Sequence, residues 1–375
     1  TLALLTILLL GTNYTFSAYA TGGLETQLQT MLCLLVADAS SRCLATGSCT
    51  TRRGILISML SAAAVLTRLD SVLLCVIFLV ALLLEAWRGK RGPAVTAALL
   101  LPAGMIIGAW FAWKLSYYGN ILPNSFYIKA SSITSVERGF NYLCEFFGSY
   151  ILWPFLAAVV FFGNLLFQRK EDRPLMLFAL IAVLWMLYII KVGGDFMEFR
   201  FMVPILPALF MLFVWTMFIV LKRPVFRVLG VALIIAGTLH HASSFSYTIE
   251  NGIEPVRDLR GHVLDGDKNW VGIGQALRRE IGDSSVVVAT TAAGAIPYYS
   301  RFRAVDMLGI NDPWVARNGI VIGTTPGHQR IAPLSYLVRR NVNLVISHPL
   351  VMPLDAPVKH FPLIPWDEEL KQGGQ

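Results

Sequence analysis

Charged side chains are scarce in this chain, and their scarcity excludes an ordinary water-soluble globule. Asp, Glu, Lys and Arg make up 14% of the 375 residues, whereas 55% are hydrophobic and the mean hydropathy is +0.62. A soluble protein of this size does not normally show that balance. We therefore expect lipid to be the solvent for most of the chain.

Cysteines are also few, and common nucleotide-binding signals are missing. The five cysteines all precede residue 145, and the topology below places Cys43 and Cys49 in the cytoplasm, so no disulfide framework is expected. Internal repeats, low-complexity tracts and phosphate-loop spacing are absent from the sequence. The net charge of +8 comes from short basic clusters and not from one stripe, which argues against a nucleic-acid partner.

The start of the chain lacks both a Met and a basic leader. Residues Thr1 to Leu10 are apolar, with no basic region ahead of them, so they form neither a complete signal peptide nor a full first span. We expect the chain to begin within a longer protein.

The sequence does contain a series of apolar stretches, which recur up to Ser243 and then stop. Many approach the roughly 20 residues that cross a bilayer. The expected fold is an α-helical polytopic membrane protein with about nine spans and a truncated N-terminus. The candidate spans are Leu2–Tyr19, Leu24–Ala39, Gly54–Leu66, Ser71–Trp87, Ala94–Leu115, Ser149–Phe167, Leu175–Val192, Phe201–Leu221 and Val228–His241.

Twelve lysines and arginines set the expected orientation. They occupy alternate loops, and the intervening loops hold about half as many. Because cytoplasmic loops carry an excess of Lys and Arg, the basic loops are expected in the cytoplasm. These residues are Arg42, Arg52, Arg53, Arg88, Lys90, Arg91, Arg169, Lys170, Arg173, Lys222, Arg223 and Arg227.

The run from Gly54 to Trp87 has two interpretations, because Arg68 and Asp70 interrupt it. It could be two short helices or one long helix with a buried ion pair. Two helices keep the alternation of basic loops intact, so we adopt them. The outward loops are then Thr21–Glu25, Arg68–Asp70, Tyr117–Phe147 and Gly193–Arg200.

Residues 244–375 differ in composition from residues 1–243. They carry spaced charges, four of the six histidines and many Gly and Pro residues. Trp270–Ile281 has helical spacing, and Ser285–Thr290 and Val342–Ser347 are β-branched runs. We expect a transmembrane domain over residues 1–243, followed by a soluble α/β domain on the outward side.

Charges at the end of a span are costly and usually functional, so the outward loops hold the candidate site residues. Glu25 stands at the mouth of a span, where the helix dipole alone could favour a carboxylate. Arg68 and Asp70 could instead form a structural ion pair in a turn. Asn124 and Lys129 lie in an aromatic-rich segment, and an interfacial aromatic belt does not require them.

The loop from Lys191 to Phe201 is the strongest candidate. It contains Asp195, Glu198 and Arg200 after the glycine pair Gly193–Gly194. Arginine offers planar, multidentate donation to phosphate oxygens, and a nearby carboxylate can accept a proton or hold a sugar hydroxyl. A solvated interfacial turn is the alternative interpretation.

The C-terminal domain offers weaker candidates. Asp306 and Asp312 precede His328, but one His and two Asp do not make a metal site by their spacing. A lone His is more often a satisfied surface or core residue. The sequence identifies no cofactor and no metal site. Trp314 and His328 suggest a groove for an acceptor on this domain.

Five motifs in this order resemble a family of bacterial membrane glycosyltransferases of the GT-C type. The resemblance is closest to the arabinofuranosyltransferases that finish mycobacterial cell-wall arabinan with terminal β-(1→2) residues, and to their uncharacterised relatives. It runs over nearly the whole chain. One departure is Arg68-Leu69-Asp70, where relatives usually have Arg-Pro-Asp. The motifs are Gly23–Thr26, Thr67–Asp70, Tyr118–Lys129, Gly193–Phe201, and Asp306–Gly309 with Pro326–His328.

The resemblance implies an enzyme of the bacterial cytoplasmic membrane whose C-terminal domain lies in the periplasm. It would take a sugar, for example arabinofuranose, from a polyprenyl-phosphate donor and transfer it to a cell-wall or envelope glycan or glycolipid. Nucleotide sugars stay in the cytoplasm, so an outward-facing transferase needs a lipid-linked donor at the membrane–water interface on the outward side. The expected partners are the bilayer, this donor and the acceptor.

The resemblance also distributes roles among the residues. Such enzymes generally place an Asp, the base for the acceptor hydroxyl, in the first outward loop, and no Asp occurs here before Asp38, so we expect that base upstream of Thr1. Donor phosphate or substrate contacts would come from Arg68, Asn124, Lys129, Arg200 and His328. Supporting carboxylates would be Glu25, Asp70, Asp195 and Glu198.

Two other functions stay open. A transporter or flippase of lipid-linked glycans would also need charges at the membrane lip, but it usually shows two related halves and midplane polar residues, which this sequence does not. A non-catalytic envelope assembly protein would bind cell-wall polymer through its soluble domain. An upstream span and an Asp-containing loop would favour the enzyme.

Overall fold

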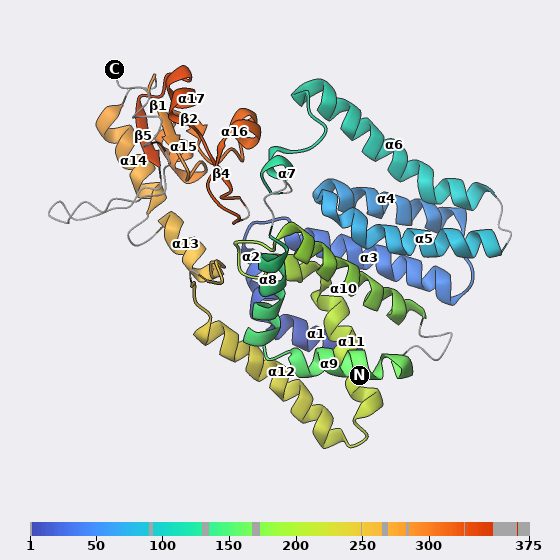
Figure 1. Cartoon of the computed structure of the whole chain (residues 1–375). Helices are drawn as coiled ribbons and strands as arrows, with labels where there is room; N and C mark the ends of the chain where they lie inside the picture. Colours follow the sequence, from blue (N-terminus) through green and yellow to red (C-terminus); the bar gives the residue numbers. More distant parts are fainter. Residues whose placement is uncertain are drawn as a thin grey trace. The chain divides into compact units, whose positions relative to one another are not determined.

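The computed structural model describes residues 2–89, 93–129, 135–166, 173–248, 250–264, 269–282, 285–325, 327–347 and 366 (Figure 1). These fall into two compact units. The first unit comprises Thr1–Ile121, Phe140–Ile190 and Phe199–Phe245. The second comprises Leu122–Gly139, Lys191–Glu198 and Ser246–Gln375, so it includes two segments that the sequence places between spans.

Long apolar helices build the first unit, and six of the described stretches are long and apolar enough to cross a bilayer. The number reaches eight if α1 with α2, bent by 68°, and α8 with α9, bent by 104°, each form one span. The helices are α1 (Leu2–Thr12), α2 (Tyr14–Thr21), α3 (Thr26–Ala45), α4 (Thr51–Thr67), η1 (Leu69–Ser71), α5 (Val72–Arg88), α6 (Pro93–Tyr118), α8 (Val136–Ser149), α9 (Trp153–Leu166), α10 (Arg173–Val192), η3 (Arg200–Ile205), α11 (Leu206–Val220) and α12 (Pro224–Ser244).

Even the count of eight is one fewer than the nine expected spans, and the span missing from it is α4. This helix has 17 residues, which extend about 26 Å at 1.5 Å per residue and fall short of roughly 30 Å of hydrocarbon. The helical, apolar character of the region agrees with a membrane protein, and the count of nine stays a prediction. The chain does break between α4 and α5, as the two-helix interpretation predicts.

Burial differs strongly among these helices. In the stretch Arg200–Val220, which contains α11, 72% of the apolar window is buried, against 11% for α6. Leu101, Met105 and Trp113 of α6 are more than half exposed. A helix that is apolar all round and still exposed suits lipid as its solvent, whereas α11 forms the interior of the unit.

Phe199 lies at the centre of an aromatic cluster in the first unit. Its backbone is left-handed at φ 40°, which costs about 1–3 kcal/mol for a bulky residue, and its side chain is fully buried. Ring contacts at 5.1–6.2 Å offset this strain and hold the loop that leads into η3. The contacting rings belong to Tyr142, Phe146, Tyr150, His241 and Phe245.

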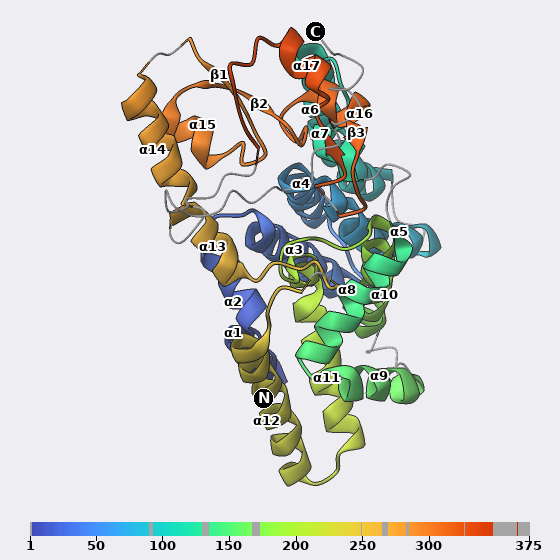
Figure 2. The ribbon, with the colours of Figure 1, turned by 60° about the vertical axis from the view of Figure 1, so that its left-hand side comes forward.

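The second unit is a small α/β arrangement (Figures 1 and 2). Three parallel strands have the order β2-β1-β5, and a second sheet pairs β3 with β4 antiparallel. The helix expected over Trp270–Ile281 and the two expected β-branched strands are confirmed by α14, β1 and β5. The elements are α7 (Asn124–Lys129), α13 (Val256–Leu264), α14 (Trp270–Ile281), β1 (Val287–Thr290), α15 (Ala295–Ser300), β2 (Arg303–Asp306), α16 (Pro313–Asn318), β3 (Ile320–Val321), β4 (Arg330–Ile331), α17 (Leu334–Arg339) and β5 (Leu344–Ser347).

The close approach of α12 to Tyr150 generates a first prediction. A Cβ at Gly237 would collide with the Tyr150 carbonyl oxygen, whereas a Cβ at Gly108 in α6 would meet nothing within 4 Å. Gly237→Ala should cost about 1–3 kcal/mol, because the helix must move away from the aromatic cluster. Gly108→Ala, the control, should be neutral or stabilise by up to about 1 kcal/mol. Thermal unfolding in detergent measures both, and equal melting temperatures would contradict this account.

Candidate functional site

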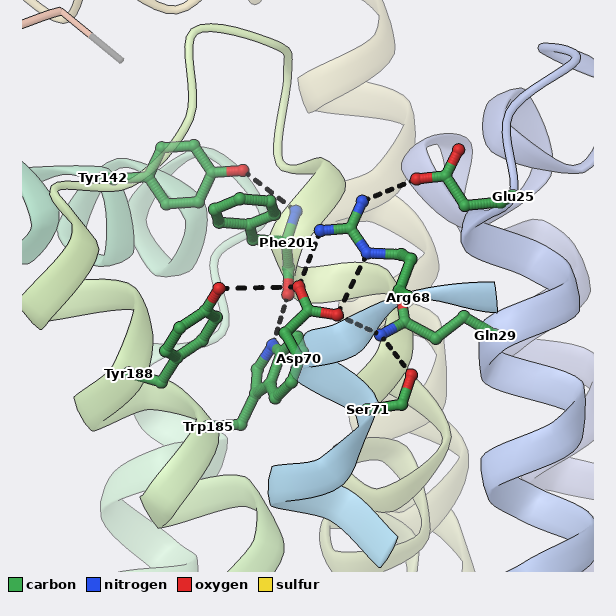
Figure 3. A network of polar contacts seen from close by, with 9 residues as sticks. All are labelled: Glu25, Gln29, Arg68, Asp70, Ser71, Tyr142, Trp185, Tyr188 and Phe201. Atoms are coloured by element: carbon green, nitrogen blue, oxygen red, sulfur yellow. Dashed lines mark hydrogen bonds and ion pairs between the residues drawn. The ribbon is translucent and has the colours of Figure 1, made fainter. Parts of the chain in front are cut away.

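Arg68 is the centre of a polar network in the first unit (Figure 3). Its Nε and Nη2 donate to Asp70 Oδ1 and Oδ2 at 3.1 and 2.6 Å, and its Nη1 donates to Glu25 Oε1 at 2.7 Å. The side chains of Arg68 and Asp70 are 17% and 10% exposed, whereas that of Glu25 is 39% exposed. The two-pronged pairing with Asp70 orients the guanidinium plane, and Glu25 forms the more open side of the network.

The break between α4 and α5 produces this geometry. Arg68 is extended (φ −149°, ψ 128°), and Asp70 lies in the short helix η1. Residues two apart on a continuous helix do not face each other, so this ion pair requires the break. The main chain stays bonded across it, because the Arg68 amide donates to Ala64 O and the Ser71 amide donates to Arg68 O, both at 3.0 Å.

Two further helices contribute side chains to Asp70. Gln29 of α3 donates from Nε2 to Asp70 Oδ1 at 2.9 Å and to Ser71 Oγ at 3.0 Å. The Tyr188 hydroxyl of α10 lies 3.5 Å from Asp70 Oδ2. Sequence reasoning missed both residues. The signal for Gln29 was its place four residues after Glu25, because that spacing puts the two side chains on one helix face.

Arg200 brings a second cation to the network. The guanidinium carbons of Arg68 and Arg200 each lie 5.5 Å from the centre of the Phe201 ring. Burial raises the pKa of the Glu25 carboxyl, but hydrogen bonds from its own backbone and from Arg68, together with the charges of Arg68 and Arg200, bring that pKa below its ordinary value. Glu25 is therefore an anion at neutral pH. The negative charges of Glu25 and Asp70 thus balance the positive charges of Arg68 and Arg200.

The main chain at Phe201 is held by two buried side chains. Trp185 Nε1 donates to the Phe201 carbonyl at 2.6 Å, and the Phe201 amide donates to the Tyr142 hydroxyl at 3.3 Å (Figure 3). These bonds satisfy backbone groups where the chain turns into η3. Arg200 directly precedes Phe201, so its backbone is held in place by these bonds. Neither Trp185 nor Tyr142 was a predicted site residue.

The structure assigns Asp195 and Glu198 to the second unit, and both are buried. Glu198 Oε2 accepts from the amide of Val256, the first residue of α13, at 2.7 Å, so it caps that helix. Asp195 Oδ1 accepts from the Phe196 amide at 3.0 Å. The Glu198 and Glu254 main chains are also bonded, at 3.0 Å. These contacts hold the loop in place. That Asp195 and Glu198 bind sugar hydroxyls stays a prediction.

The remaining predicted contacts also belong to the second unit. Asn124 begins α7 and is half-buried, whereas the side chain of Lys129 lies outside the described part, as does Pro326. His328 is exposed, and its ring meets Phe196 edge to face at 5.2 Å. Trp314 instead stacks on Tyr336 at 4.2 Å, against the core of the unit. The first unit thus gathers four of the predicted residues, which are Glu25, Arg68, Asp70 and Arg200.

An open cavity of about 400 Å³, the cleft, lies in the second unit, and His328 and Asp306 line it. The Asp306 carboxylate accepts from the Leu308 and Asn311 amides at 2.9 and 2.7 Å. Burial raises the pKa of Asp306 above its ordinary value, aided by the charge of Asp312 and opposed by the amide hydrogen bonds. Within the described residues, no three His, Cys, Asp or Glu side chains are grouped so that they could hold a metal ion.

The ion pair of Arg68 with Asp70 generates a second prediction. Asp70→Ala should lower stability by about 3–5 kcal/mol, because it leaves a largely buried arginine without its two-pronged partner. The control is Asp38→Ala, since Asp38 pairs with Arg42 at 2.9 Å but both side chains are more than half exposed. That change should cost less than about 1 kcal/mol. Thermal unfolding compares the two variants, and similar losses would show that Asp70 does not anchor the network.

The cap of α13 generates a third prediction. Glu198→Ala should speed hydrogen exchange at the Val256 amide, because removing a helix cap costs about 0.5–2 kcal/mol. Glu250→Ala serves as the control, since Glu250 is an exposed residue of the same unit. Mass-spectrometric exchange of peptides covering α13 provides the measurement. Unchanged protection in Glu198→Ala would remove the capping role.

Comparison with known proteins gives partial matches. Residues 259–369 match the model of a family described as a domain of unknown function (DUF8728). A terminal β-(1→2)-arabinofuranosyltransferase of Corynebacterium glutamicum is 34% identical over 138 residues. That match covers 32% of this chain and 19% of the relative, so the chain spans about a fifth of that protein's length. No solved structure matches. The chain is thus similar, over part of its length, to a glycosyltransferase.

Proposed function

We propose that this chain belongs to a membrane glycosyltransferase that uses a polyprenyl-phosphate sugar as donor. The acceptor is a glycan or glycolipid of the cell envelope, on the outer face of the bacterial cytoplasmic membrane. The observation that carries the proposal is a network within a unit of apolar helices: Arg68 and Arg200 each lie 5.5 Å from the centre of the Phe201 ring, and Arg68 pairs with Glu25 and Asp70. The similarity to an arabinofuranosyltransferase supports the reaction class and makes arabinofuranose the first sugar to test.

The two arginines suit a phosphate group. Within the described part of the chain, Arg68 donates three hydrogen bonds, all of them to carboxylate oxygens. An arginine has five N–H donors, so two are left for a ligand. Arg200 adds positive charge on the same ring, and a low-dielectric setting strengthens both contacts. In this proposal Asp70 holds Arg68 in place, and Glu25, the most exposed of the paired residues, accepts hydrogen bonds from sugar hydroxyls.

The reaction is a substitution at the anomeric carbon of the donor. The acceptor hydroxyl oxygen forms a bond to that carbon, and the bond from carbon to the phosphate oxygen breaks with its electron pair leaving on the lipid phosphate. The hydroxyl proton passes to a carboxylate base, which the family resemblance places in the first outward loop. Arg68 and Arg200 stabilise the charge that grows on the leaving phosphate.

A fourth prediction tests this function. Arg200→Ala in the complete natural protein should lower turnover by about 10² or more, as expected for the loss of a charged contact to the leaving group. Arg42→Ala is the matched control, because Arg42 is exposed and forms a surface ion pair with Asp38. The assay uses membranes containing each protein and a panel of polyprenyl-phosphate sugars, with arabinofuranose first. Wild-type turnover in Arg200→Ala would remove Arg200 from the site.

A further inference from the structure

The cleft of the second unit lies at the carboxyl ends of parallel strands. We propose that it binds a neutral carbohydrate and so forms a second glycan site on this protein. This region falls largely within the matched domain of unknown function. The inference goes beyond the proposed function, because binding at the cleft does not require the transfer reaction.

The topology of the sheet places the cleft where α/β folds usually bind ligands. β1 is the central strand, with β2 on one side and β5 on the other, and all three are parallel. Ligands of open α/β sheets bind outside the carboxyl ends of the strands, and the cleft opens at the neighbouring carboxyl ends of β1 and β2. The cleft is lined there by Thr291–Ala295, which follows β1, and by Asp306, which ends β2.

The lining is acidic, polar and aromatic. Glu254, Asp306 and Asn311 supply oxygen acceptors, and Asn311 also supplies N–H donors. His262 lies 3.9 Å from Glu254 and 5.5 Å, ring to ring, from Trp270, so these three side chains form one wall. Sugars present hydroxyls that both donate and accept, together with apolar ring faces that pack on aromatic side chains.

The charge of the lining selects against anions. Among the described residues that line the cleft there is no Lys or Arg, whereas two are carboxylic acids. The carboxyl groups of Glu254 and Asp306 disfavour a phosphate because like charges repel, and the described lining offers no arginine or lysine to offset that repulsion. The opposite holds for the network in the first unit, where two arginines gather. The chemistry of the cleft thus fits a neutral, hydroxyl-rich ligand.

Small residues leave room for such a ligand. The turn after β1 runs through Ala292, Ala293, Gly294 and Ala295, all of which line the cleft. Their side chains have one carbon or none, and a Cβ at Gly294 would meet nothing within 4 Å. The cavity volume of about 400 Å³ lies within the roughly 300–1,000 Å³ of typical ligand pockets, so it has room for one or two sugar rings.

Ligand-observed NMR with the whole protein in nanodiscs tests the inference. The probe is a neutral β-(1→2)-linked arabinofuranose disaccharide, and inorganic phosphate is the competitor. Asn311→Ala, at an exposed position of the cleft, should weaken saturable binding about tenfold, as should Trp270→Ala. Trp270→Phe should retain binding within about twofold, because a ring remains. Asn318→Ala is the control, since Asn318 is an exposed asparagine outside the cleft.

The outcomes separate this inference from the proposed function. Weaker binding in Asn311→Ala, with Arg200→Ala binding normally, supports a site in the cleft even if no transfer is detected. Circular dichroism of Trp270→Ala checks that loss of binding is not unfolding. The inference is overturned if the disaccharide does not bind, if all cleft variants bind equally, if phosphate displaces the sugar, or if only Arg200→Ala loses binding.

Discussion

A largely buried arginine must keep its anionic partners, and much of the first unit is arranged around that constraint. Arg68 is 17% exposed, and moving a charge out of water is expensive unless good hydrogen bonds compensate. Pairing with Asp70 demands that the helix break between α4 and α5. Pairing with Glu25 brings the start of α3 to this break, and Tyr188 links α10 to it. The network around Arg68 therefore joins the break between α4 and α5 to α3 and α10.

A second constraint operates at the entry to η3. Phe199 has a strained backbone, and the aromatic rings around it hold that conformation. Trp185 and Tyr142 then satisfy the main chain of Phe201. Arg200 lies between these two anchored residues. An arginine in that position can stabilise charge without first reorganising, which is the property that transfer to and from a phosphate requires.

Local features of the structure could be predicted from the sequence, and long-range ones could not. Helix α14 spans Trp270–Ile281 as its periodicity indicates, and the two charges Arg68 and Asp70 predict the break between α4 and α5. The partnership of Arg68 with Glu25 joins residues 43 positions apart, so no local pattern contains it. Similarly, one short motif holds both Glu198 and Arg200, yet they belong to different units.

The cleft escaped sequence analysis for the same reason. Its lining comes from Phe196, from α13, from the first residue of α14 and from two strand ends, and only the fold of the second unit brings them together. The sequence did single out His328, which lines the cleft, but it also suggested Trp314, whose ring is stacked on Tyr336. An aromatic residue predicts burial or binding equally well, and its packing partners decide between them.

The central claim is that Arg68 and Arg200 together receive the phosphate of a lipid-linked sugar. A structure of the complete natural protein with a polyprenyl-phosphate sugar bound measures this directly. The account predicts phosphate oxygens at hydrogen-bond distance, about 2.7–3.2 Å, from both guanidinium groups, with Asp70 still paired to Arg68. A phosphate bound elsewhere, with Arg68 contacting only Glu25 and Asp70, would contradict it.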